Sequence, residues 1–515
     1  MNAALMIIAV ILVGSTALGL IAGRRVPMNL EGWSVGGRRF GVVLVWLLMA
    51  GEVYTTFTFL GASGWAYGRG APAFYILVYG TIAYILSFFV LPLLWRAGKD
   101  RGLHTQPDYF LDRYGSRALA GLVALIGVAA IVPYLQLQLT GLGLIVEIAS
   151  AGAIGSEAAM IVAFALTCVF VYTSGLKGSA WVAIVKDVTM LVAVLVVGIG
   201  LPRIYFGGIG AMLHELMRQH PQHLVFPGAT TSMGTLWVIS TLLLSGLGFY
   251  MWPHQFPSFF SAKSEDTIRR NAIIMPLYQL PILFVFFVGF TALLVIPGLK
   301  NPDTALLALV AKTYPPWFLG FVGAAGALTA MVPASVLLLA AATLLAKNVY
   351  RPLVERWLIM HRPGSDVRSP KSGSTPDPGH RTPDDGDAQL ADAHLMKASR
   401  GMMLGVALLA LALALWAPNE LVKLLLFGYD GVCQFFPAVV LGLFIRRLDL
   451  RAATAGIVSG VVCVAFLIAT GRDPQWGMNA GFVAFLVNLV VTLIVTLFAP
   501  GSRPLAAQSQ RRAAA

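Results

Sequence analysis

Glu52 stands in the middle of a stretch that is otherwise apolar enough to cross a membrane. It follows the apolar residues 45–51, and its neighbour Gly51 weakens a helix at that point. A carboxylate at the centre of a bilayer costs roughly 2.5 to 3.5 kcal/mol even on insertion scales. It persists where it faces a cavity, a partner or an ion. A charge beside a weak point in a membrane helix therefore predicts a transport site.

Composition places the whole chain in the membrane. Of 515 residues, 58% are hydrophobic and 11% are charged, which is typical of a polytopic membrane protein and excludes a soluble domain. The net charge of +13 does not indicate nucleic acid, because the basic residues lie beside apolar stretches. The cysteines have no metal-ligand spacing, so we expect neither a disulfide nor a metal site. We find no GxSxG, HExxH or Walker-type motif and expect no enzyme.

Apolar stretches of about 20 residues recur along the chain, and about thirteen could cross a bilayer. Their approximate bounds are 3–23, 40–66, 73–96, 118–149, 156–174, 180–204, 233–256, 272–297, 316–347, 401–417, 419–445, 452–470 and 478–499. With the N-terminus outside, most of the 36 Lys and Arg residues lie in inner loops. This asymmetry predicts a multi-pass protein of a bacterial-type plasma membrane with a cytoplasmic C-terminus.

Two of these spans are interrupted, and they are five spans apart. The second contains Gly51, Gly61 and Gly64, and the seventh contains the glycines and Pro253 of residues 245–254. Interruptions at this spacing indicate two inverted five-helix repeats, each with a broken first helix; ordinary packing kinks are the alternative. The predicted segments are a first helix and inner loop at 1–39, a first repeat at 40–204, an outer loop at 205–232, a second repeat at 233–445 with a disordered inner loop at 362–397, and two extra helices with a tail at 446–515.

Several short motifs resemble the sodium:solute symporter family in their order and spacing. They are residues 36–40, 105–116, Lys186-Asp187, Pro253-His254 and 347–350. Within the family the chain looks most like the bacterial monocarboxylate permease branch, on residues 51–56, 267–271 and 331–335. The resemblance implies an all-α protein with a five-plus-five, leucine-transporter-type core.

The resemblance also implies an activity: symport of a short monocarboxylate such as lactate, pyruvate or acetate by alternating access. Its partners would be the solute, a coupling ion (H⁺ or Na⁺) and the lipid bilayer, with no other cofactor, and the protein would be a monomer or a weak oligomer. Two alternatives stay open. One is a Na⁺-coupled symporter of another small solute, such as an amino acid. The other is a transporter-like sensor that binds without moving its solute.

One departure from the family bears on the coupling ion. Sodium-coupled relatives present two adjacent Ser/Thr hydroxyls to Na⁺ where this chain has Val332 and Pro333, which carry no side-chain oxygen. Asp187 matches an acidic residue on the sodium exit route of relatives. We therefore expect Glu52 and Asp187 to couple transport to a proton. For Glu52, residual cation binding or a structural role, paired with Lys186 or with unwound backbone, remain alternatives.

Candidate substrate contacts lie on the broken helices and the fourth span. Backbone amides of an interrupted helix and hydroxyl groups suit a carboxylate. Gln136 and Gln138 stand two positions apart on a helix, so we expect one of them at most to reach the cavity. The predicted substrate-binding residues are Gly51, Tyr54, Thr55, Thr56, Gln136 and Tyr250.

Overall fold

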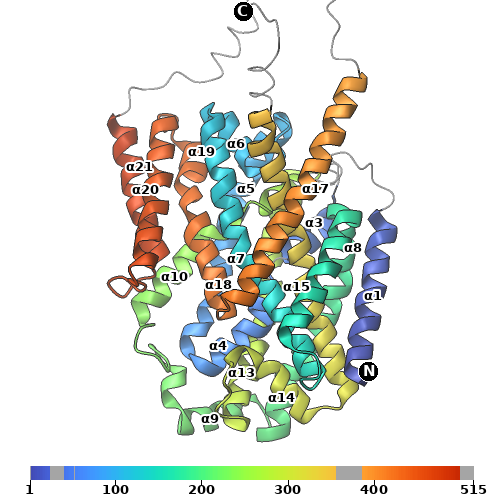
Figure 1. Ribbon diagram of the computed structural model, residues 1–515. Coiled ribbons are helices and arrows are strands. Elements are labelled where there is room, and N and C mark those ends of the chain that lie inside the picture. Colours follow the sequence, from blue (N-terminus) through green and yellow to red (C-terminus); the bar gives the residue numbers. More distant parts are fainter. Residues whose placement is uncertain (1, 24–39, 52, 355–384, 499–515) are drawn as a thin grey trace, which may run out of the picture.

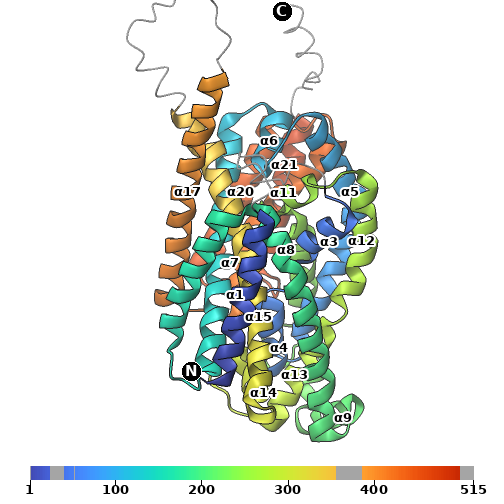
Figure 2. The ribbon, with the colours of Figure 1, turned by 90° about the vertical axis from the view of Figure 1, so that its right-hand side faces the viewer.

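The computed structural model describes residues 2–23, 40–51, 53–354 and 385–498. The described chain is helical, with two isolated β-bridges and no strand (Figures 1 and 2). Ten of its helices are long and apolar enough to cross a membrane, and three shorter apolar helices accompany them. This agrees with the predicted thirteen. The first residue of α1 and the last of α21 lie at opposite ends of the bundle (Figure 1).

The elements follow the order of the two predicted repeats. Ahead of the repeats stands α1 (Ala3–Gly23). The first repeat contains α3 (Val42–Gly51), η2 (Phe57–Gly61), α4 (Ala62–Gly68), η3 (Ala71–Phe74), α5 (Tyr75–Asp100), α6 (Gln106–Tyr114), α7 (Arg117–Ala149) and α8 (Ser156–Phe206). The outer loop holds α9 (Ile209–Gln219) and η4 (Pro221–Leu224).

The second repeat and the C-terminal helices follow. The second repeat contains α10 (Thr235–Gly248), η5 (Phe249–Met251), α11 (Gln255–Phe260), α12 (Glu265–Gln279), α13 (Ile282–Val295), η6 (Pro302–Thr304), α14 (Ala305–Thr313), α15 (Pro316–Leu344), η7 (Leu345–Tyr350), α17 (Asp385–Trp416), α18 (Leu421–Val432), η8 (Cys433–Phe435), η9 (Pro437–Leu441) and α19 (Gly442–Phe444). The two extra helices are α20 (Leu450–Ala469) and α21 (Ala480–Phe498).

The helix α8 differs from the sequence expectation, because its helical assignment continues over 51 residues where two spans were predicted. A straight helix of that length would measure about 77 Å. Its two ends nevertheless lie at the same end of the bundle. Ala149, just before α8, accepts a hydrogen bond from Asn2, and Tyr205 bonds Thr313 at the outer end of α14. The element therefore reverses direction and still makes two passes, with no non-helical break to mark the turn.

The helix α17 begins inside the range predicted as a disordered loop. It starts at Asp385, so residues 385–397 are helical, whereas residues 362–384 of that loop lie outside the described part. The last proline before α17 is Pro383, and residues 385–397 after it include three Ala and two Leu. These residues favour helix, so the membrane helix extends beyond its apolar part.

The helix α15 lies at the centre of the bundle and packs against α1, α7 and α8 (Figure 2). Small residues permit this close packing. A Cβ atom added to Gly320 would lie 2.7 Å from the carbonyl oxygen of Ala4, and one added to Gly326 would lie 3.0 Å from Phe59. The consequence is that α15 approaches α1 and η2 at short range.

At the predicted cytoplasmic end, an ion pair ties α6 to η7. Asp108 accepts hydrogen bonds from Lys347 Nζ at 2.7 Å and from Asn348 Nδ2 at 3.1 Å. Burial alone would raise the pKa of Asp108, but Lys347, the His104 N–H and Asn348 together hold that pKa below its ordinary value. A charged, fully bonded carboxylate thus joins the end of α15 to the first repeat.

Candidate ion and substrate site

The first broken helix frees two backbone carbonyls in the middle of the bundle. The helix α3 ends at Gly51, and helical structure resumes with η2 after a turn that contains Tyr54. The Nζ atom of Lys186, from α8, donates to Gly51 O at 3.0 Å and to Tyr54 O at 3.4 Å. Unpaired carbonyls are costly at membrane depth, so this side chain stabilises the break. Glu52 lies outside the described residues, and its role stays a prediction.

Asp187 forms an ion pair with its own neighbour. Lys186 Nζ lies 2.9 Å from Asp187 Oδ1, and the same oxygen accepts a hydrogen bond of 2.7 Å from the Tyr278 hydroxyl of α12. The side chains are buried, at 0% and 4% exposed respectively for the lysine and the aspartate. Asp187 Oδ2 has no hydrogen-bond partner among the described residues. One carboxylate oxygen is therefore free to accept a proton or a donor group.

Val332 lies at the same place and presents only carbon. A Cβ atom added to Gly51 would lie 4.0 Å from Val332 Cγ1 and 3.8 Å from Lys186 Nζ. Pro333 is buried beside it in α15. The nearby Ser335 hydroxyl is engaged elsewhere: it donates to Val332 O at 2.6 Å and lies 2.7 Å from the Ser179 hydroxyl. The two positions thus offer no side-chain oxygen to a cation.

The two threonines after the break are buried and hydrogen-bonded. Thr55 N–H donates to Thr58 Oγ1 at 3.0 Å, which closes the turn locally. The Thr56 hydroxyl donates to Gln138 Oε1 of α7 at 2.8 Å. Gln138 is fully buried, and its Nε2 has no partner among the described residues. An amide donor without a partner next to a broken helix is suited to a solute carboxylate.

Gln136 is not brought together with these residues. Its Nε2 donates to Ala417 O at 2.7 Å and to Leu413 O at 3.2 Å, which are carbonyls at the end of α17. In this structure Gln136 therefore caps a neighbouring helix, whereas Gln138, two positions on, reaches the broken helix. The spacing argument predicted that the two would face different sides, and the sequence prediction named Gln136 as the substrate contact. That role stays a prediction, and the structure brings Gln138 rather than Gln136 to the broken helix.

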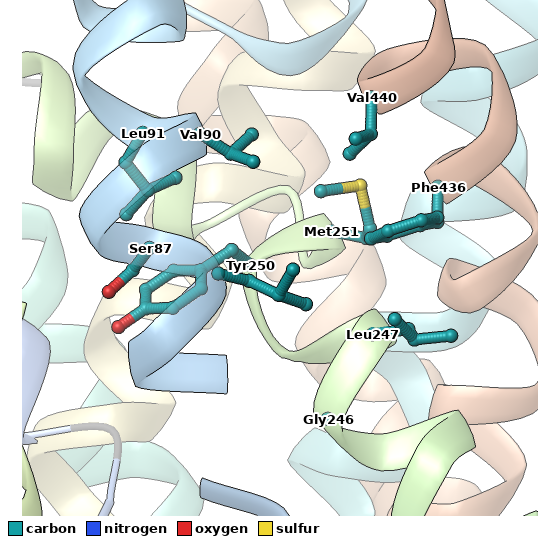
Figure 3. A pocket seen from close by; sticks show the side chains of 10 residues that line it. Ser87, Val90, Leu91, Gly246, Leu247, Tyr250, Met251, Phe436 and Val440 are labelled. Atoms are coloured by element: carbon teal, nitrogen blue, oxygen red, sulfur yellow. The ribbon is translucent and has the colours of Figure 1, made fainter. Parts of the chain in front are cut away.

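Tyr250 lies on η5, in the second broken helix, and lines a small apolar cleft. In Figure 3 its hydroxyl points toward that of Ser87 on α5, while Met251 faces Val440 across the cleft. Tyr250 is linked to α5 through aromatic contacts: the ring centroids of Tyr250 and Phe249 lie 4.8 Å apart, and that of Phe249 lies 6.0 Å from that of Tyr84. The backbone of this second break is also bonded, since Gln106 Nε2 donates to Met251 O at 2.7 Å.

Tyr278 connects α12 to the first break and Gln279 connects it to α5, and sequence reasoning missed both. The Tyr278 ring packs edge-on against Tyr54, with centroids 5.0 Å apart. Gln279 Oε1 accepts a hydrogen bond from the Tyr84 hydroxyl, and its Nε2 donates to Leu77 O at 2.9 Å. The sequence signal that could have identified them is the presence of two adjacent polar residues, Tyr278 and Gln279, within an otherwise apolar span. The described residues hold no group of three or more His, Cys, Asp or Glu side chains that could bind a metal.

The amino-acid sequence matches a known family of transporters. A model of the sodium:solute symporter family matches residues 33–357. The chain belongs to this family. A relative from Bacillus subtilis named "uncharacterized symporter YhjB" is 42% identical, and the alignment covers 98% of this chain and 99% of the relative. The sodium:solute symporter assignment makes the protein a multi-pass membrane transporter that moves a solute with a coupling ion.

A further relative and a solved structure are similar to the chain in sequence and in fold, respectively. A monocarboxylate transport permease protein of Rhizobium johnstonii is 28% identical, with 96% of both chains covered. The fold is that of a Na⁺-coupled sialic acid symporter solved in a substrate-bound, outward-open state, with a TM-score of 0.75 at 15% identity over 98% of this chain and 99% of that chain. This likeness confirms the leucine-transporter-type fold of the sodium:solute symporter family for the chain.

Proposed function

We propose that this symporter takes up a short monocarboxylate, such as lactate, pyruvate or acetate, together with a proton. The similarity to a monocarboxylate transport permease supports the solute class. The buried Gln138 amide and the Tyr250 hydroxyl, which have no hydrogen-bond partner among the described residues, are donors that suit a carboxylate. The protein would lie in a plasma membrane with its N-terminus outside.

The observation that carries proton coupling is the apolar surface at Val332 and Pro333. A sodium ion needs several oxygen ligands, by analogy with other hard cations. Val332 places a methyl group beside Gly51 instead. Asp187, with one oxygen that has no partner among the described residues, and Glu52 are the proposed proton-handling groups. A monocarboxylate anion moving with one proton carries no net charge, which avoids about 2.3 kcal/mol per charge per 100 mV of membrane potential.

Uptake of radiolabelled pyruvate into proteoliposomes tests this proposal, with a pH gradient and a Na⁺ gradient imposed separately. We expect an inward proton gradient to drive accumulation at equal Na⁺ concentrations. Glu52→Gln should abolish pH-driven accumulation and leave pyruvate exchange partly intact. Glu157→Gln, at an exposed position of α8, is the matched control and should behave as wild type. Accumulation driven by Na⁺ at clamped pH would refute proton coupling. Full pH-driven accumulation by Glu52→Gln would show that Glu52 takes no part in the coupling.

A further inference from the structure

The ammonium of Lys186 occupies a cage of oxygen atoms at the break after α3. It contacts Gly51 O at 3.0 Å, Tyr54 O at 3.4 Å and Asp187 Oδ1 at 2.9 Å. An ammonium group has three N–H donors, and these three oxygens match them. Lys186 is completely buried. Two carbonyls and a carboxylate are the oxygen types that hold hard cations in proteins, and here a side chain of the protein holds that position.

We propose that Lys186 is a tethered cation, which holds the break of α3 to α8 in place of a dissociable ion. The inference rests on the proposed transport function and adds to it the identity of the cation at this position. A tethered ammonium cannot leave with the solute, so this position transmits no Na⁺ gradient. Na⁺ accordingly has no place there, and the energy of transport must enter through another group.

The surroundings of the ammonium support this assignment over a simple surface-type ion pair. A buried charge is stable only when its partners are in place, and Lys186 bonds the backbone of a different helix as well as its neighbouring carboxylate. Val332 closes the space beside Gly51 with carbon, so a second cation would meet no additional side-chain oxygen from that position. The oxygen atoms between α3 and α8 thus favour one positive charge, and the side chain of Lys186 supplies that charge as part of the chain.

The proposal predicts cation-specific rescue when the side chain is removed. The assay is pyruvate counterflow in proteoliposomes at equal pH on both sides, so that added amines cannot act through a pH gradient. We expect Lys186→Ala to lower counterflow at least about tenfold, and ethylammonium to restore it several-fold. Ethanol, a neutral molecule of similar size, should not restore it. Lys186→Met, which fills the same space without charge, should be inactive and resistant to rescue.

The matched control is Lys312→Ala. Lys312 also donates to a backbone carbonyl, Val295 O at 3.2 Å, but at an exposed position. The Lys312→Ala variant should keep wild-type counterflow and show no response to ethylammonium. Undiminished counterflow by Lys186→Ala, or equal activity of Lys186→Met and wild type, would overturn the tethered-cation proposal, as would loss without any rescue by ethylammonium or Na⁺.

A second measurement needs no knowledge of the solute. Na⁺ should leave the thermal unfolding temperature of the wild-type protein in detergent unchanged relative to choline, because its cation position is filled. Na⁺ should raise the unfolding temperature of Lys186→Ala, in which the cation position is vacated, because a ligand that binds the folded state stabilises it. Stabilisation of the wild type by Na⁺ would overturn the proposal even where Lys186→Ala fails to fold. Absence of pyruvate transport by wild type would refute the proposed solute and leave this measurement valid.

Discussion

The hydroxyl of Tyr278 donates a hydrogen bond of 2.7 Å to Asp187 Oδ1 and so joins α12 of the second repeat to α8 of the first. The same tyrosine packs edge-on against Tyr54 in the first break. In alternating access the two repeats must move relative to each other. A bond between a buried carboxylate and a tyrosine of the opposite repeat is therefore placed to connect the state of the ion site with that movement.

Replacing Tyr278 by Phe removes this hydrogen bond and preserves the ring packing. A hydrogen bond to a charged group contributes roughly 1.5–3 kcal/mol. We expect Tyr278→Phe to lower the unfolding temperature in detergent and to reduce pH-driven pyruvate accumulation. Tyr205→Phe is the control, since it removes a bond to Thr313 between neutral hydroxyls near the outer surface. Equal effects of the two substitutions on transport would contradict a special role for the Tyr278–Asp187 contact.

Gln138 and Gln136 should separate solute binding from helix packing. The Nε2 atom of Gln138 has no partner among the described residues, whereas that of Gln136 caps α17. If Gln138 donates to the solute carboxylate, Gln138→Leu should raise the KM for pyruvate about tenfold or more, because a charge-assisted hydrogen bond is lost. Gln136→Leu should lower thermal stability with little change in KM. A larger KM effect from Gln136→Leu would restore the sequence prediction that this residue contacts the solute.

The positions of the helices were predictable from sequence, because length and hydropathy determine where a chain can cross a bilayer. The break at Gly51 was predictable too, from a glycine beside a charge. The reversal between residues 174 and 180 was also predicted, as the connection between two spans, and it contains Gly175 and Gly178. What the sequence did not indicate is that helical structure continues through it. The start of α17 was placed too late for a related reason: its polar first turns look like a linker by composition, yet their residues favour helix.

The partners of the site residues were less predictable than their positions. Adjacent residues on a helix leave it in different directions, so helix geometry alone does not favour a Lys186–Asp187 pair. The structure forms that pair at 2.9 Å, because the long lysine side chain can turn back toward its neighbour. Tyr278 is 91 residues from Asp187 in the chain. No local pattern reports a contact over that separation; only the packing of α12 against α3 and the position of α8 beside them create it.

A last prediction concerns Asp303, in the segment between α13 and α14 and outside the membrane-spanning helices. Asp303 Oδ2 accepts a hydrogen bond of 3.0 Å from the Leu421 N–H at the start of α18. A Cβ atom added to Gly64 of α4 would lie 2.7 Å from Asp303 Oδ1. The carboxyl group therefore lies where η6, α4 and α18 meet. Burial raises the pKa of Asp303 to about 6, although the Leu421 N–H opposes the rise.

The sign of the pH effect follows from this raised pKa. Between about pH 4 and pH 6 the folded protein holds a proton at Asp303 that the unfolded chain has released, so the contribution to stability is greatest below this window and is lost as pH rises through it. We expect the unfolding temperature of the wild type, relative to Asp303→Asn, to fall as pH rises from about 4 to about 6 and then to level off. Asp266→Asn, at an exposed ion pair with Arg270, should leave the wild-type profile unchanged. An Asp303→Asn profile parallel to that of wild type would show that the carboxyl group does not titrate in this window.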